Sequence, residues 1–166
     1  MNILGIDPGL AITGYALIEA KNDTNIKLLE AGVIRTKAHD QIDSRLAKIY
    51  SALSGLIKEN KPHVLVLEKL YSHYKHPTTS ILMSHARGVI CLICGLNNIR
   101  LVSYPSTRIK KAVTGAGHAS KIQVQRMVSE ILKLKKIPEP VDVTDALALA
   151  LSFVYIELRG SGIAVI

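Results

Sequence analysis

The chain begins MNILGIDPGLAITGYALIEA (residues 1–20), in which two apolar segments are joined by a Pro-Gly turn. Residues 2–7 have the composition of a buried strand and residues 11–20 that of a second strand, so the opening predicts a β-hairpin. The first strand ends on Asp7. Because a charge at the end of a buried strand is costly unless it has a partner, Asp7 is the first candidate functional residue.

The rest of the chain alternates between strand-like and helical patterns. HVLVLE (63–68) is a continuous apolar run typical of a buried parallel strand, and apolar residues recur at helical spacing over 43–60. Three antiparallel strands followed by βα units predict an α/β fold with a five-stranded mixed sheet and helices on both faces. Ser120 is a candidate N-cap. We expect strands at 2–7, 11–20, 27–36, 63–68 and 99–104, and helices at 43–60, 78–97, 120–135 and 142–158, with another beginning at Pro105.

Length and composition predict a basic globular domain. With 166 residues, of which 48% are hydrophobic, the chain is suited to one domain and is not a disordered chain. We expect residues 1–158 to form this domain and 159–166 to be a short tail. Lysine and arginine number 21 against 13 aspartate and glutamate, a net charge of +8. That charge favours a polyanionic partner, nucleic acid first and an anionic membrane second.

Other patterns bear on location and redox chemistry. The longest uncharged runs, from Gly88 to Arg100 and over 146–156, are too short to span a bilayer, and the start lacks a secretory pattern. We therefore expect a cytoplasmic protein that spans no membrane. Cys91 and Cys94 form a CxxC motif, which admits a redox role, whereas a zinc site would need a second pair that the sequence lacks. Their apolar surroundings favour two core residues on one helix face.

Four carboxylates stand at the ends of predicted elements. Asp7 ends the first strand, Glu68 ends the fourth, and Asp142 and Asp145 share one face at the start of the last helix. Each also has an ordinary interpretation. Asp7 suits a turn, Glu68 marks the end of a strand, Asp142 suits an N-cap, and both late acids favour the helix dipole.

Taken together, these acids predict a metal site. If the first and fourth strands are neighbours, their carboxyl ends meet, and the last helix adds two acids at the same point. Four converging carboxylates repel one another unless cations bind there. Oxygen ligands suit Mg²⁺ or Mn²⁺, and two such ions can hold the attacking and leaving oxygens of a phosphodiester. Within a chain of net charge +8, this predicts a metal-dependent nuclease.

Five segments in order carry a family resemblance: ILGIDPGLAITGYALI, VLVLEKLY, ARGV, GAGHASKIQVQRMV and DVTDALALA. Over residues 2–155 they resemble the RuvC family of Holliday junction resolvases. The resemblance implies an RNase H-like fold and a homodimer that cuts two symmetric strands of a four-way DNA junction in recombination and repair. It also implies up to two Mg²⁺ or Mn²⁺ ions per subunit and contacts with a branch-migration motor of the RuvA and RuvB type. The implied catalytic, metal-binding acids are Asp7, Glu68, Asp142 and Asp145.

The resemblance assigns further residues to DNA. Tyr71 corresponds to an aromatic side chain near the junction centre, where stacking on an unpaired base is worth about 1–3 kcal/mol. Lys110 and Lys121 correspond to functional lysines that pair with phosphate or stabilise transition-state charge, and we count Lys121 as catalytic. Lys111 is included as a DNA contact, although the ordinary role of a solvated surface lysine is more credible for Lys111 than for Lys121. Tyr71 also has an ordinary role as half-buried loop filler.

The chain departs from the expected family pattern in two places. The loop 71–80 is longer and richer in histidine than expected, and we interpret His73 and His76 as part of a DNA-facing loop rather than a metal site. The last residues, GSGIAVI, are apolar where a basic tail is expected.

Three alternatives stay open at this point. Actin-like and sugar-kinase ATPases share the Gly-Ile-Asp-x-Gly opening but need a second domain, which 166 residues cannot supply. A relative that acts in ribosomal RNA maturation has a similar fold, although its opening differs and ARGV with DALALA favours the resolvase. A non-catalytic junction-binding module is the third alternative, and the presence of all four acids counts against it.

Overall fold

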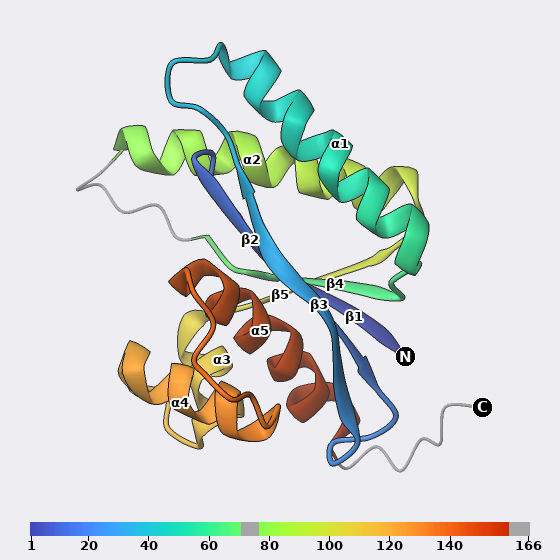
Figure 1. Ribbon diagram of the computed structural model, residues 1–166, viewed down its shortest axis with the longest axis vertical. Helices are drawn as coiled ribbons and strands as arrows, with labels where there is room; N and C mark the ends of the chain where they lie inside the picture. Colours follow the sequence, from blue (N-terminus) through green and yellow to red (C-terminus); the bar gives the residue numbers. More distant parts are fainter. Residues whose placement is uncertain (71–76, 160–166) are drawn as a thin grey trace.

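The computed structural model describes residues 1–70 and 77–159, which form a five-stranded sheet covered by helices on both faces (Figure 1). The predicted mixed α/β architecture is confirmed. In chain order the elements are β1 (Asn2–Asp7), β2 (Ile12–Ala20), β3 (Ile26–Arg35), α1 (Ile42–Asn60), β4 (Val64–Glu68), α2 (Pro77–Leu96), β5 (Arg100–Tyr104), α3 (Ser106–Thr114), α4 (Lys121–Ile131), α5 (Val141–Phe153) and a π-helical turn, η1 (Val154–Leu158).

The strands lie in the order β3-β2-β1-β4-β5. β1, β2 and β3 are antiparallel neighbours, whereas β4 pairs with β1 and β5 in parallel. The predicted contact between the first and fourth strands is therefore present. In the register of β1 with β4, Gly5 stands opposite Val66, and continuing it by two residues brings Asp7 beside Glu68.

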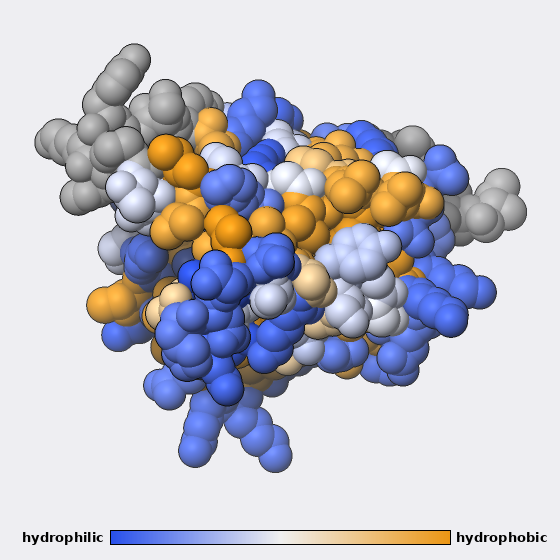
Figure 2. Space-filling model, turned by 90° about the horizontal axis from the view of Figure 1, so that it is seen from above, coloured by the Kyte–Doolittle hydropathy of each residue, from blue (hydrophilic) through white to orange (hydrophobic). Residues whose placement is uncertain are grey.

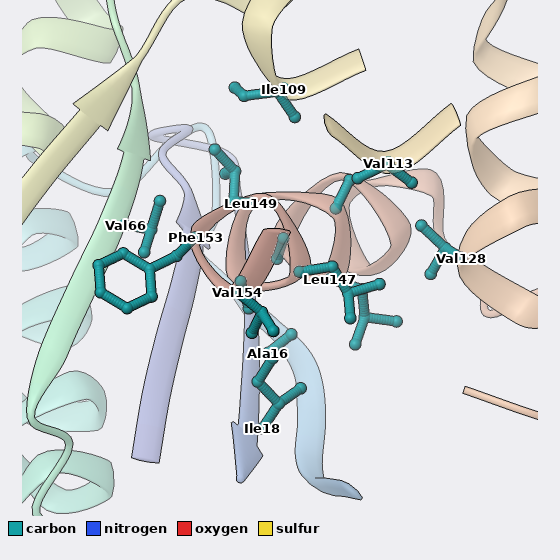
Figure 3. Close-up of a cluster of buried hydrophobic side chains, with 14 of the residues drawn as sticks. Ala16, Ile18, Val66, Ile109, Val113, Val128, Leu147, Leu149, Phe153 and Val154 are labelled. Atoms are coloured by element: carbon teal, nitrogen blue, oxygen red, sulfur yellow. The ribbon is translucent and has the colours of Figure 1, made fainter. Parts of the chain in front are cut away.

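Two apolar cores lie on the two faces of the sheet because successive strand side chains point to opposite faces. In β4, Leu65 and Leu67 belong to the core beneath α1 and α2, while Val64 and Val66 belong to the core beneath α3, α4 and α5. Figure 3 shows the second core, with Val66 of the sheet close to Phe153 of α5. Every residue of α5 from 146 to 153 is buried, so this helix lies in the middle of its layer.

Most predicted elements end within two residues of the observed ones, but two helix ends differ. The helix predicted over 120–135 ends at Ile131, because Lys133 has a left-handed φ of 51° and the chain turns there. The predicted cap is correct, since Ser120 Oγ accepts a hydrogen bond from the Gln123 backbone N–H, which is 3.3 Å away. The helix predicted over 142–158 changes at Val154 from α to π geometry.

The helix α2 combines a buried and an exposed apolar face. Cys94 is buried and Cys91 half-buried against the core beneath α1, and neither forms a disulfide, which agrees with their predicted core role. By length and composition alone, the segment Thr78–Leu96 could cross a membrane, although its longest uncharged run is too short. Of the apolar window in this segment, 22% is buried in the fold. Apolar side chains on its outer face contribute to a surface seen from above in Figure 2.

Candidate active site

Two of the four candidate acids stand at adjacent strand ends. Asp7 is the last residue of β1 and Glu68 the last residue of β4, and both are half-buried. Parallel strands end at the same edge of a sheet, so the carboxylates leave the two strands in the same direction. Glu68 also fits its ordinary interpretation, because β4 ends at this residue.

Close packing between α5 and the sheet brings the other two acids to this edge. A Cβ on Gly14 would overlap the carbonyl oxygen of Asp142, and one on Gly5 would overlap backbone atoms of Ala146 and Ala150. Gly14 is also the strand partner of Asp7. Only glycine permits this approach. The start of α5 therefore lies directly on β2, beside the end of β1.

The ordinary interpretation of Asp142 as an N-cap does not hold. Pro140 is the N-cap of α5, and Asp142 lies in the first turn, where it makes no capping hydrogen bond through its side chain. A carboxylate in this turn is still favoured by the helix dipole. Because the carboxylate of Asp142 is not used for capping, it is available for a role at the sheet edge.

The site itself is a hollow of about 310 Å³ between the strand ends and three helices. Three acids, Asp7, Glu68 and Asp145, share its wall with Lys110 and Lys121. The Lys121 Nζ lies 3.8 Å from Asp145 Oδ2, and the lysine side chain is largely exposed. Asp142 does not line the hollow, although its charge contributes to the raised pKa of Asp7. The remaining lining residues are Ser106, Ile109, Val124, Ala148 and Leu149.

Burial and mutual repulsion raise the pKa values of these acids. Burial, followed by the charges of Asp145, Asp142 and Glu68, raises the pKa of Asp7 to about 7. Burial also raises the pKa of Glu68, although a hydrogen bond from Ser106 opposes this, and burial raises that of Asp145 against the effect of Lys121. The repulsive part of this shift shows that a cation bound among these carboxylates would relieve their mutual repulsion.

The donor set fits a hard divalent cation. Among the described residues, no three His, Cys, Asp or Glu side chains are gathered closely enough to form a ready-made cage. Mg²⁺ rarely uses such a cage, because it keeps several waters and binds through one or two carboxylates together with substrate phosphates. The carboxylate oxygens spread around the wall of the hollow suit that mode of binding.

The remaining predicted residues have different positions. Lys110 and Lys121 reach the hollow from α3 and α4, whereas Lys111 is exposed and is not part of its wall. Tyr71, with His73 and His76, lies outside the described residues. Sequence reasoning gave no role to Ser106, which hydrogen-bonds Glu68, or to the two glycines beneath α5. The sequence signal for this contact was the presence of glycines inside otherwise apolar strands, which indicates that another backbone approaches closely.

The raised pKa of Asp7 predicts an unusual effect of pH on stability. Between about 3.8 and about 7 the folded protein holds a proton on Asp7 that the unfolded chain has lost. Stability without metal therefore falls as the pH rises through this window. We expect Asp7→Asn to remove this loss, so that in EDTA at about pH 8 the variant melts at a higher temperature than the wild type. Parallel pH dependence of the two melting temperatures would contradict the prediction.

Comparisons with known proteins agree on one family. A family model described as Crossover junction endodeoxyribonuclease RuvC matches residues 3–153. A protein of that name from Rhodopirellula baltica is 46% identical over 90% of this chain and 83% of its own length. Another from Caldicellulosiruptor saccharolyticus is 42% identical over 91% of this chain and 90% of its own.

Solved structures give the same result. The structure of RuvC from T. thermophilus in complex with a Holliday junction substrate has a TM-score of 0.86 and 27% identity, and covers 93% of both chains. The yeast mitochondrial Holliday junction resolvase has a TM-score of 0.63 and 15% identity over 92% of this chain and 77% of its own, which bears on the fold alone.

Proposed function

This chain belongs to the RuvC family of crossover junction endodeoxyribonucleases, and we propose that it resolves four-way DNA junctions at the hollow on the sheet edge. The family is metal-dependent, and the fold is the RNase H-like fold that the resemblance implies. Membership of this family counts against the alternative role in ribosomal RNA maturation. The acids in the hollow count against a module that only binds junctions.

The observation that carries this proposal is the convergence of carboxylates from β1, β4 and α5 on one hollow that two lysines also enter. We assign Asp7, Glu68, Asp142 and Asp145 as the catalytic acids, which would hold Mg²⁺ (or Mn²⁺), up to two ions per subunit. Bound ions of this kind polarise a phosphodiester and stabilise the charge on its attacking and leaving oxygens.

Basic side chains supply the rest of the proposed chemistry. Lys121, beside Asp145, is placed to donate to a phosphate oxygen and to offset transition-state charge, and Lys110 lies on the same wall. We propose that both contact the DNA near the cut and that exposed Lys111 contacts the backbone further away. Tyr71 keeps its proposed stacking role on an unpaired base at the junction centre.

A cleavage assay with matched DNAs tests this function. The substrates are a synthetic four-way junction and a linear duplex carrying the same sequences, each incubated with Mg²⁺ or with EDTA. We expect paired, symmetric cuts in the junction, with Mg²⁺ only. Equal cutting of the duplex, or no junction cleavage with Mg²⁺ or Mn²⁺, would overturn the proposal.

We also propose that the protein works as a homodimer through the outer face of α2. Ile81, Leu92 and Leu96 are 57%, 56% and 61% exposed on this helix, and Figure 2 shows apolar side chains gathered on the face that includes it. A twin helix would bury this surface. Two-fold symmetry also matches paired cuts in a junction.

The dimer predicts the effect of a single charge on α2. Leu92→Glu would bury an unpaired carboxylate at the centre of a symmetric interface, so we expect monomers at micromolar protein in sedimentation and loss of paired cutting. Ile137→Glu is the matched control, because Ile137 is 41% exposed in the loop before α5. A wild-type protein that sediments only as a monomer, with or without junction DNA, would contradict the dimer.

Association with a branch-migration motor of the RuvA and RuvB type and a cytoplasmic location complete the proposed setting. Both rest on family membership.

A further inference from the structure

A single arginine connects α2 to the strand ends beneath it. Arg87 is half-buried, and no other lysine, arginine, aspartate or glutamate occurs in α2. Its Nη1 donates to the backbone carbonyl oxygen of Glu68 at 2.7 Å, and its Nη2 donates to Ser103 Oγ at 3.0 Å. One guanidinium group therefore holds the ends of β4 and β5 together.

Arg87 makes these hydrogen bonds at the point where β4 and β5 end. Leu67 still pairs with Ser103 and Glu68 with Tyr104, and the Lys69 N–H donates to the Tyr104 carbonyl at 2.8 Å. The carbonyl that Arg87 holds belongs to Glu68 itself, so the arginine restrains the backbone from which this carboxylate projects. A charged donor makes this bond stronger than an ordinary backbone bond.

Glu68 is thus held at two points. Its carboxylate accepts a hydrogen bond from Ser106 at the start of α3, and its carbonyl accepts the bond from Arg87 on the opposite face of the sheet. Arg87 makes no ion pair with any described carboxylate. Its charge therefore acts on the peptide group and leaves the acid free for other ligands.

We propose that Arg87 is a positioning residue of the active site, which acts through Glu68 by fixing the end of β4. The proposal rests on the assignment of Glu68 as a metal ligand. Side chains that orient ligands in this way typically change metal affinity or activity by about 10–100-fold when they are replaced. Two other roles would leave metal affinity unchanged, namely a contact to DNA phosphate and simple support of the fold.

The test compares Arg87→Met with a matched variant. Arg45→Met is suitable because Arg45 is also half-buried, donates to a threonine hydroxyl (Thr36 Oγ1, 2.9 Å) and lies on α1 in the same layer. Mn²⁺ affinity of each dimer is measured without DNA by electron paramagnetic resonance. The Mg²⁺ concentration for half-maximal junction cleavage, junction affinity in EDTA and melting temperature complete the set.

We expect Arg87→Met to weaken Mn²⁺ binding about tenfold or more and to raise the Mg²⁺ requirement by a similar factor, with junction affinity in EDTA unchanged. Arg45→Met is expected to alter only the melting temperature. Arg87→Lys keeps the charge but has no fork to reach both acceptors, so it should fall between the wild type and Arg87→Met.

Three results would overturn the proposal. Unchanged Mn²⁺ affinity in a folded Arg87→Met protein would remove the positioning role, and loss of junction affinity in EDTA with normal metal binding would assign the arginine to DNA. If Arg87→Met does not fold, Arg87→Lys takes its place in the titration, because it cannot reach both acceptors, and Mn²⁺ affinity equal to that of the wild type would then overturn the proposal. A wild type that binds Mn²⁺ but cuts no junction contradicts the proposed function instead, because the Mn²⁺ titration needs no DNA.

Discussion

Asp7→Asn is expected to lower junction cleavage in Mg²⁺ about a thousandfold or more. The change keeps the shape of the side chain and removes one negative charge from the acid whose pKa the site perturbs most strongly, to about 7. If Asp7 holds metal, several kcal/mol of transition-state stabilisation is lost with it. A cleavage time course under single-turnover conditions measures the effect. We expect the same direction for Glu68→Gln, Asp142→Asn and Asp145→Asn.

Binding should respond differently from cleavage. Without divalent metal, up to four carboxylates concentrate negative charge where a phosphate must lie, so removing one should leave junction affinity in EDTA equal or improved. The salt dependence should change little, because the lysine and arginine contacts that release counterions are untouched. A gel-shift titration in EDTA decides between the roles. Joint loss of binding and cleavage would indicate a structural turn role for Asp7, and retained cleavage would exclude it from the metal site.

Gly14→Ala is expected to have the largest effect on stability, about 3 kcal/mol or more. A Cβ at this position would overlap the backbone of Asp142, so α5 must move away from β2. Since α5 is buried along most of its length, it has little room to shift. The same movement would carry Asp142 and Asp145 away from Asp7, so cleavage should fall even in the protein that remains folded.

A second glycine provides the control. Gly55 lies in α1, and a Cβ there would meet no atom within 4 Å. Gly55→Ala should therefore stabilise the protein by about 0.5–1 kcal/mol, because alanine favours a helix interior. Urea unfolding of both variants measures the difference. If Gly14→Ala is as stable as the wild type and cuts junctions normally, the close approach of α5 does not position the acids.

The sheet shows how far local patterns reach. The strand segments, their order along the chain and the hairpin at Asp7 follow from alternation, apolar runs and turn residues. All of these are local properties of the sequence. The helix ends were less predictable. Apolar residues continue past Ile131, but Lys133 adopts a left-handed conformation that ends α4, and the change to π geometry at Val154 likewise leaves no clear mark in the sequence.

The site shows where local reasoning stops. Residue type and spacing predicted four acids as metal ligands, because chemistry constrains which side chains can serve a metal, and the family resemblance added two lysines. They did not show that Ser106 hydrogen-bonds Glu68, that Arg87 holds its carbonyl, or that Asp142 stands outside the wall of the hollow. Each of these depends on elements far apart in the chain.

The sequence by itself therefore determined the order of strands and helices along the chain and the family, and it predicted the four acids. Only the tertiary structure decided how the acids stand relative to one another. That arrangement depends on two backbones in close contact, α5 against Gly5 and Gly14, and on the register of β1 beside β4. Contacts of this kind join residues distant in sequence, so no local periodicity records them.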